Sequence, residues 1–277
     1  MLENALSCLR CPLCGGTLEQ RGKSLFCPKN HCHDIAKQGY VNLAPAQKGT
    51  FYKKELFESR AKVFEAGVFA PVVEAIGEAL DRHVPRKAPV ILDAGCGEGY
   101  YLRSVCPERA MTRIGFDIAK EAVQLAARTS KDCTFFVGDL AKIPVGDGLC
   151  DAVLDVFTPA NYREFARVLK KDGLLIKLAP RAGYLKELRE AAKDQLRHAA
   201  YDGGQVESYA KAHMHMLEQR TITYTLPVDG ELAFHLARMT PMLAGVDVDA
   251  LDLSAVRSIT IDETLYIGTV ERMEETK

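Results

Sequence analysis

The sequence predicts an α/β protein in which helices cover both faces of a parallel sheet, with a small metal-binding module ahead of it. Three observations support this class. From Val90 onward, apolar runs of strand length alternate with helical patterns. The first run ends in Asp93, and glycines then occupy every second position up to Gly99. Five of the nine cysteines fall within the first 32 residues.

The composition bounds the kind of protein. A chain of 277 residues that is 47% hydrophobic can form one large domain and a small appended one. No apolar run approaches the length of a membrane span, and the N-terminus lacks the basic start and apolar stretch of a signal peptide. We therefore expect a cytoplasmic protein with no membrane partner, in which the clustered cysteines favour a metal over disulfides.

The formal net charge of -1 divides unevenly at Val63. Residues 1–63 carry ten Lys and Arg against five Asp and Glu, whereas the remainder carries 26 against 32. A basic end on an acidic body fits a protein that touches nucleic acid, or another polyanion, through that end alone. A basic surface that is merely solvated is the alternative.

Residues 1–36 form the predicted metal-binding module. Cys11 and Cys14 make one pair of soft ligands, and Cys27 and His31 make a second pair after twelve intervening residues. Two such pairs can each form a knuckle-like turn, so that four thiolate or imidazole groups surround one zinc ion. The fourth ligand stays open, with three further candidates: Cys8, Cys32 and His33. Free buried cysteines are the alternative for the whole cluster.

Residues 37–85 are predicted to be a linker followed by basic helices. A short extended piece is expected at 40–43, and a helix begins near Lys53 with Lys54, Arg60 and Lys62 on a basic face. This face either contacts RNA or is solvated. A second helix is expected from Val72 to Leu80, before the break at Pro85–Pro89.

Residues 86–277 are predicted to form the main domain. The expected strands are 90–94, 111–117, 134–138, 151–157 and 173–179. The expected helices are 99–106, 119–129, 160–170 and 184–197. The tail adds a strand at 221–226, a helix around 231–243 and a long strand at 256–270, and little room for a crossover makes one of the last two strands antiparallel.

The glycines at positions 95, 97 and 99 follow the first strand of this sheet, where a doubly wound fold binds its ligand. The dinucleotide fingerprint requires a glycine three positions after Gly97, but that residue is Tyr100. The chain also lacks the GxxxxGK(S/T) loop that cradles a triphosphate. The loop therefore predicts a ligand other than a dinucleotide or a nucleoside triphosphate.

Acidic residues end three successive predicted strands. Asp117 is placed to accept the ribose hydroxyls of a nucleoside, and Asp139, followed by Leu140, to accept an exocyclic amine of adenine. Asp93 lies close enough to receive a charged amine of the ligand. Each acid alone is more often a loop cap, but together they favour a positively charged nucleoside over one that carries phosphates.

The segment Asp93–Gly99, with its Asp-x-Gly-x-Gly-x-Gly pattern, resembles the class I S-adenosylmethionine-dependent methyltransferases. The resemblance covers about residues 70–277. It implies a seven-stranded, Rossmann-like class I methyltransferase sheet in the order 3-2-1-4-5-7-6, with strand seven antiparallel. It also implies S-adenosylmethionine as the cofactor.

Nearly the whole chain is similar to the bacterial 23S ribosomal RNA (guanine-N1)-methyltransferases of the RlmA type. The similarity rests on the Cys and His pairs, on Asp34–Leu43 and on Gly95–Tyr101. It implies a zinc module that recognises an RNA hairpin, and a homodimer with an RNA-sized cleft. The zinc ligands that it implies are Cys11, Cys14, Cys27 and His31. The cofactor contacts that it implies are Phe69, Gly99, Tyr100 and His198.

Methyl transfer to guanine N1 requires alignment of the base and removal of the N1 proton. Asp155 and Asn161, after the fourth predicted strand, are the candidate residues for that proton, and Phe157 between them is a candidate for stacking on a flipped base. The alternative is that Asp155 is a loop carboxylate without a proton role.

These features predict methyl transfer from S-adenosylmethionine to N1 of a guanine in a 23S rRNA hairpin. A small-molecule methyltransferase with a structural zinc module is one alternative, and its binding should be insensitive to salt. A non-catalytic RNA-binding protein is another, and cofactor binding would discriminate it. Members of the family differ between neighbouring guanines of one hairpin, and some of these modifications affect macrolide susceptibility.

Overall fold

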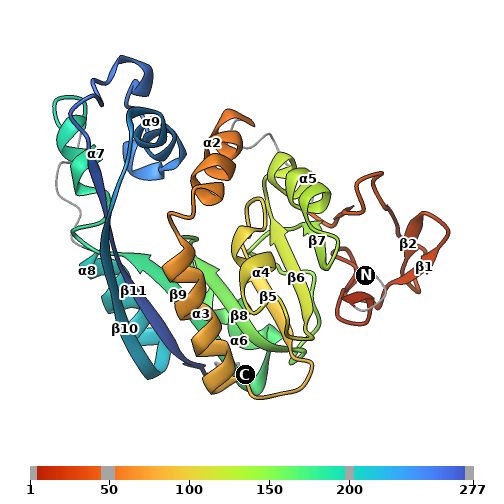
Figure 1. The fold of residues 1–277 in the computed structure, drawn as a ribbon. Coiled ribbons are helices and arrows are strands. Elements are labelled where there is room, and N and C mark those ends of the chain that lie inside the picture. The colour runs from red at the N-terminus through yellow and green to blue at the C-terminus, as the bar shows by residue number, and fades with distance from the viewer. Residues whose placement is uncertain (1–4, 45–53, 197–202, 272–277) are drawn as a thin grey trace.

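The computed structural model describes residues 5–44, 54–196 and 203–271 of the chain. Within these residues, eight strands form one large sheet in the order β10-β11-β9-β8-β5-β6-β7-β4. Three short N-terminal strands form a separate small sheet at one side of the molecule (Figure 1). None of the helices in the described ranges combines the length and apolar character needed to span a bilayer.

Five parallel strands make the centre of the large sheet, and they confirm the five strands predicted from the apolar runs. Their residues are largely buried because layers cover both faces of the sheet. β9 begins earlier than predicted, because Leu169 pairs with Cys150 and ends the preceding helix. The bounds are β5 Val90–Ala94, β6 Thr112–Asp117, β7 Cys133–Val137, β8 Cys150–Val156 and β9 Leu169–Pro180.

The C-terminal strands confirm the expected antiparallel pairing. β11, Ser258–Val270, lies between β9 and β10, Met214–Pro227, and is antiparallel to both. The strands β7-β6-β5-β8-β9-β11-β10 thus have the order 3-2-1-4-5-7-6 of a class I methyltransferase sheet. The described part of the chain has the α/β fold that the sequence predicts.

The expected count of seven strands is wrong by one. β4, Val41–Asn42, adds an eighth strand by pairing in parallel with β7, with Val41 opposite Phe136. Val41 is fully buried. The sequence predicted an extended piece here but not its partner, since a two-residue strand carries no periodicity. β4 covers an edge of β7 that would otherwise present unpaired backbone groups.

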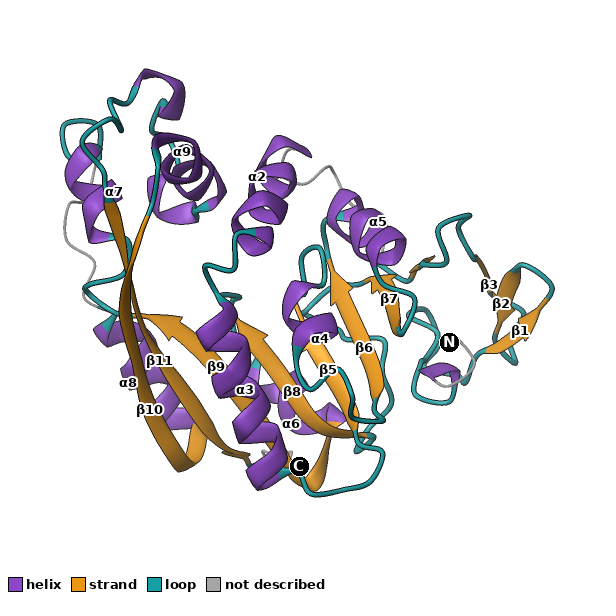
Figure 2. Cartoon of the chain, viewed as in Figure 1, coloured by secondary structure: helices purple, strands orange, loops and turns teal. Residues whose placement is uncertain are grey.

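Helices cover both faces of the large sheet, as predicted (Figure 2). Those on one face are α3 Ala70–His83, α4 Tyr100–Ser104 and α5 Lys120–Thr129. Those on the other face are α6 Tyr162–Val168 and α8 Gly204–His213. The sequence pattern did not predict α8, because Ala210 is its one fully buried residue and its other residues are mostly polar.

Two further helices lie over the carboxyl edge of the sheet. α2, Lys54–Glu65, packs beside α9, Gly230–Met239, and the two are joined by an ion pair from Lys62 to Glu231 (3.2 Å). Lys53, which the sequence placed at the start of this basic helix, lies outside the described residues. α7, Lys186–Ala191, is shorter than the predicted helix over 184–197 and packs on β11.

The N-terminal segment is small and packs against the large sheet. Its antiparallel strands are β1 Glu19–Arg21, β2 Ser24–Phe26 and β3 Cys32–Asp34. Leu9 forms a β-bridge with Val145, and the backbone N–H of Arg10 donates to the carbonyl of Pro144 (2.9 Å). The segment therefore abuts the polypeptide that follows β7, close to the carboxyl edge of the sheet.

Candidate active site and metal centre

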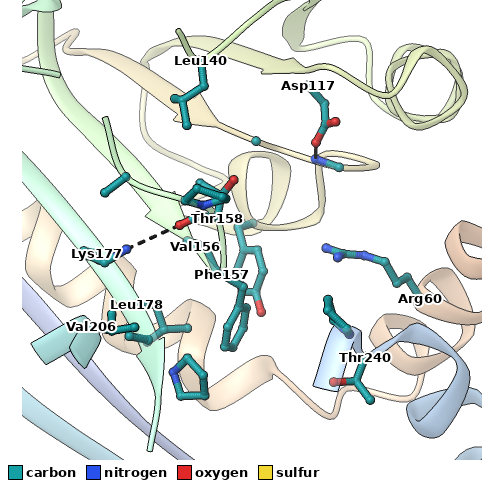
Figure 3. Close-up of a pocket in the computed structure, with 18 of the residues that line it drawn as sticks. Arg60, Asp117, Leu140, Val156, Phe157, Thr158, Lys177, Leu178, Val206 and Thr240 are labelled. Carbon is teal, nitrogen blue, oxygen red and sulfur yellow. Dashed lines mark hydrogen bonds between the residues drawn. The ribbon is translucent and has the colours of Figure 1, made fainter. Parts of the chain in front are cut away.

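A cavity of about 960 Å³ opens at the carboxyl ends of the central strands (Figure 3). The loops after β5, β6, β7, β8 and β9 form one side, and α2 and the end of α9 form the other. A cavity of this size at this edge of a doubly wound sheet suits a nucleoside-sized ligand with room beside it. The predicted loops thus meet at one site.

The glycine loop after β5 needs glycine for steric reasons. Gly95 has φ +76°, and a Cβ there would lie 2.3 Å from the hydroxyl oxygen of Thr158. Gly99 has φ +78°, and a Cβ there would lie 2.7 Å from the ring of Phe135. Both positions therefore exclude any side chain. Gly97, at φ +56°, lies next to the guanidinium of Arg60, and both residues line the cavity.

Asp117, at the end of β6, ties this loop to the second strand. One of its oxygens accepts from the backbone N–H of Gly97 (2.9 Å) and the other from that of Ala119 (2.8 Å). Burial raises the pKa of Asp117, against the opposing effect of these hydrogen bonds. Asp139 also lines the cavity and accepts from the N–H of Ala141 (2.8 Å), and Leu140 lines it next to Asp139.

Two carboxyl groups behind the glycine loop lack partners that their burial requires. Asp93 is 1% exposed and Glu98 is 2% exposed, and one oxygen of each has no hydrogen bond within the described residues. Burial, together with repulsion from Asp117 and Glu98, raises the pKa of Asp93 to about 8. Neither residue is among those that line the cavity, so both act on a ligand there only through the negative charge that they place behind the loop.

The side chain of Arg60, from α2, reaches into the cavity. The sequence analysis did not predict this position. Its Nε donates to Glu98 (3.0 Å), and its guanidinium lies over the ring of Phe64. The charge pattern grouped Arg60 with the surface lysines of its helix, but the side chain lines the cavity. It is the arginine among the described residues that line the cavity, and its outer nitrogens can bind a carboxylate.

Aromatic rings form the wall beside Arg60. Phe69 is fully buried and lines the cavity, as does Tyr101. Tyr100, which the resemblance assigns to the cofactor, stacks on Phe64 with ring centroids 4.0 Å apart and does not line the cavity. His198, the remaining residue of that set, lies outside the described residues.

The loop after β8 forms the far end of the cavity. Phe157 lines it with a positive φ of 56°, a strained value for a residue other than glycine. Asp155 is fully buried behind the lining and pairs with Lys177 (2.8 Å), which does line the cavity. Asn161 caps α6 by accepting from the N–H of Glu164, and its amide donates to the carbonyl of Leu140.

The predicted zinc ligands converge. One ligand atom each of Cys11, Cys14, Cys27 and His31 lies within 4.8 Å of all the others. Sγ of Cys11 is 3.4 Å from Nδ1 of His31, and Sγ of Cys14 is 3.5 Å from Sγ of Cys27. Three thiols and one imidazole at these separations suit tetrahedral zinc. None of the nine cysteines forms a disulfide, and Cys8 and Cys32 lie outside the cluster.

A second cavity, of about 730 Å³, lies at the seam between this cluster and the main domain. The N-terminal segment contributes Arg10, Cys11 and Pro12, and the main domain contributes Lys142 and Arg163 among others. Nζ of Lys142 donates to the carbonyl of Pro12 (3.1 Å), which joins the two sides. The seam therefore brings four cationic side chains, Arg167 included, and two acidic ones, Asp147 and Glu164, next to the metal cluster.

Comparison with known proteins matches both regions. Residues 9–50 match the family model for the N-terminal region of RlmA, a zinc ribbon, and residues 91–173 match a methyltransferase domain model. YxjB of Bacillus subtilis, classed among the 23S rRNA (guanine-N(1)-)-methyltransferases without an assigned nucleotide, is 36% identical over 95% of this chain and 97% of its own. This chain belongs to that family.

Two other members of the 23S rRNA (guanine-N(1)-)-methyltransferases also match almost end to end. The 23S rRNA (guanine(748)-N(1))-methyltransferase of Streptomyces fradiae is 29% identical over 96% of this chain and 98% of its own. A relative from Micromonospora griseorubida is 32% identical over 93% and 98%. The resemblance on which the sequence analysis relied is therefore confirmed over both modules.

Proposed function

We propose that this chain transfers the methyl group of S-adenosylmethionine to N1 of a guanine in a 23S rRNA hairpin. The observation that carries the proposal is the set of buried carboxyl groups behind the glycine loop, in particular the unpartnered oxygens of Asp93 and Glu98. They favour a cationic nucleoside and disfavour one with phosphates. Membership of the rRNA methyltransferase family supports the same donor and supplies the acceptor.

The residues around the first cavity fit the separate parts of S-adenosylmethionine, which are its ribose, its adenine and its amino-acid end. Asp117 is suited to the ribose hydroxyls, and Asp139 with Leu140 to the adenine. Arg60, which lines the cavity, is suited to the carboxylate of the amino-acid end. Asp93, behind the glycine loop, is the acid proposed to favour the amine of that end. The other proposed contacts are Phe69, Gly95 and Gly97, which line the cavity, and Gly99, Tyr100 and His198, which the resemblance alone supports. When bound, the cofactor supplies an electrophilic methyl group on a sulfonium; the chain supplies orientation and exclusion of water.

Cys11, Cys14, Cys27 and His31 are proposed to hold one structural zinc ion per chain. The donor set supports this, because three thiolates and a neutral imidazole are ligands that zinc prefers and can surround it tetrahedrally. The ion would fix the knuckles that carry Arg10 and Pro12 at the seam. Zinc is thus assigned a role in folding and placement, not in chemistry.

The partner proposed for the second cavity is the phosphate backbone of the rRNA hairpin. Arg10, Lys142 and Arg163 supply positive charge where the zinc cluster meets the main domain. In keeping with the resemblance, we also propose a homodimer, a cytoplasmic location and an effect on macrolide susceptibility. Phe157 is proposed to stack on the target base, with Asn161 holding the loop of Leu140 beside it.

Transfer of labelled methyl groups from S-adenosylmethionine to unmodified 23S rRNA tests the proposal. The wild-type protein should label the RNA, and increasing salt should weaken RNA binding steeply. Asp117→Ala should bind the cofactor more weakly without unfolding. RNA binding without any binding of S-adenosylmethionine would favour a non-catalytic RNA-binding protein, and salt-insensitive activity on small molecules would favour the other alternative.

A further inference from the structure

Two Asp–Lys pairs join β8 to β9, one near each end of the strands. Asp151 pairs with Lys170 at the end away from the cavity, and Asp155 pairs with Lys177 at the cavity end. Both carboxyl groups are nearly or fully buried. The two pairs have the same chemistry on the same strands, so their remaining partners show what each pair does.

The Asp151 pair is complete. One oxygen of Asp151 accepts from the backbone N–H of Val90 (2.9 Å) and from Lys170 (2.8 Å). The other accepts from Lys170 (2.9 Å) and forms an ion pair with Nε of Arg86 (2.8 Å). Three cationic or N–H groups make four contacts with this buried carboxylate, which leaves it no capacity for a ligand. This pair therefore fastens β8 to β9 and to the start of β5.

The Asp155 pair is incomplete. Nζ of Lys177 donates to Oδ2 of Asp155 (2.8 Å) and makes a long contact with the carbonyl of Thr158 (3.5 Å). Oδ1 of Asp155 has no hydrogen-bond partner within the described residues. Burial raises the pKa of Asp155 to about 6, against the opposing effect of Lys177 and of the Thr158 N–H. Because an ammonium has three donors, Lys177 retains donor capacity at the cavity surface.

Lys177 also lies nearer to the cavity than Asp155 does. It is 4% exposed and lines the cavity, beside Thr158 and Phe157 (Figure 3). Asp155 is 0% exposed and lies behind that lining. A base stacked on Phe157 would meet the ammonium before it met the carboxylate. The sequence analysis assigned the proton chemistry to Asp155, whereas the contacts favour its partner as the group that touches substrate.

We propose that Lys177 is a catalytic residue that donates a hydrogen bond to O6 of the target guanine, and that Asp155 is the positioning residue behind it. The proposal rests on the proposed function. When N1 loses its proton, the resulting negative charge is shared with O6. A buried, charged donor at O6 stabilises that charge in the transition state, as an oxyanion hole does.

The transfer balances without a further cofactor. Hydroxide or water from the solvent accepts the N1 proton, and the freed electron pair of N1 forms a bond to the methyl carbon. The carbon–sulfur bond breaks with its electrons remaining on sulfur, which becomes a neutral thioether. Lys177 donates a hydrogen bond and transfers no proton in this step, and its ion pair with Asp155 (2.8 Å) holds it in place.

The same contact discriminates between purines. Guanine presents the acceptor O6 at this position, whereas adenine presents an amino group, which is a donor. An ammonium opposite that amino group would leave two donors facing each other in a desolvated site. Lys177 therefore selects guanine as well as activating it.

Replacement of Lys177 by Met in the full-length protein tests the proposal, with Lys170→Met as the matched control. Lys177→Met should lower kcat on unmodified 23S rRNA about 10²–10³-fold while leaving KM for S-adenosylmethionine unchanged. Lys170→Met should retain wild-type kcat. The wild-type rate should rise with pH and level off, and that of Lys177→Met should still be rising where the wild type has levelled, because N1 is then harder to deprotonate.

Lys177→Arg, which keeps the charge, guards against a folding artefact and should recover part of kcat and the wild-type pH profile. Equal kcat and equal pH profiles for the wild type and both Lys177 variants would overturn the proposal. So would a loss of kcat that is the same at every pH and is not rescued by Arg. A wild-type protein that methylates no rRNA would instead overturn the proposed function, and this inference with it.

Discussion

The N-terminal segment and the large sheet are stabilised in different ways. In the small sheet every residue of β1 is exposed, and Leu25 is the one fully buried residue of β2. In the large sheet every residue of β7 and β8 is buried. The large sheet can fold on apolar burial alone, whereas the segment has too little of it and needs its metal ligands and its contact with the sheet.

Removal of one zinc ligand should give the largest effect, and it should be confined to the N-terminal segment. Cys14→Ser should lose about one equivalent of zinc per chain and abolish rRNA methylation, because metal binding supplies on the order of 10 kcal/mol in small zinc modules. Metal analysis, an activity assay and a cofactor titration measure this. Cofactor affinity should stay at the wild-type value.

Cys32→Ser is the matched control, because Cys32 is exposed in β3 next to the cluster but outside it. It should keep its zinc. Unchanged zinc content in Cys14→Ser, or equal loss in Cys32→Ser, would contradict the assignment of the four ligands. Loss of cofactor binding in Cys14→Ser would contradict the independence of the sheet.

A substitution in the core of the large sheet should affect the sheet alone. Phe135→Ala in β7 removes a ring that is 1% exposed and packs under Gly99. It should lower the free energy of unfolding by about 3–5 kcal/mol, by lost burial and a residual cavity. Denaturant unfolding monitors the sheet, and metal analysis should show zinc retained at temperatures where the protein is folded. Loss of zinc from Phe135→Ala with no fall in its free energy of unfolding would contradict the view that the two regions are stabilised in different ways.

Arg60 gives a smaller effect that is specific for the ligand. Arg60→Met is best combined with Glu98→Gln, since Glu98 would otherwise remain as a buried charge without its partner. The double variant should bind S-adenosylmethionine about 10–100-fold more weakly, which corresponds to the loss of a charge-assisted pair with the carboxylate. Glu98→Gln alone is the control. Calorimetric titration that shows equal affinity for the control and the double variant would exclude this role.

Asp93 should make stability depend on pH. Its folded pKa of about 8 lies above its ordinary value of 3.8, so between these pH values the folded state holds a proton that the unfolded state has lost. The free energy of unfolding therefore falls with rising pH by about 1.4 kcal/mol per unit from this group. Asp93→Asn should lack this slope. Parallel pH profiles of unfolding for Asp93→Asn and the wild type would show that Asp93 ionises normally.

The parts of the fold that the sequence predicts are those whose signal is local. Strand periodicity, the turn at Gly95 and the ligand pairs at short spacing each lie within a few residues of one another. The extended piece that forms β4 was predicted, but its pairing with β7 was not, and α8 was missed. Both depend on the sheet they pack on, and neither has a clear apolar period. Local patterns therefore indicated the framework and the metal centre.

The residues that complete the cavity were missed because they act through distant partners. Arg60 meets Glu98 across 38 positions, and Lys177 meets Asp155 across 22. One signal for Lys177 was present, since it is a lone charge within the buried apolar run Leu174–Ala179. A charge in such a strand requires a buried partner or a function, and here both apply.

The identity of the methylated nucleoside tests the central claim most directly. Unmodified 23S rRNA is incubated with the wild-type protein and S-adenosylmethionine, digested to nucleosides and analysed by mass spectrometry against standards of the methylguanosine isomers. The account predicts 1-methylguanosine as the product, formed in the wild type and absent with Cys14→Ser. Methylation of another guanine atom, of another base, or of no nucleoside at all would contradict it.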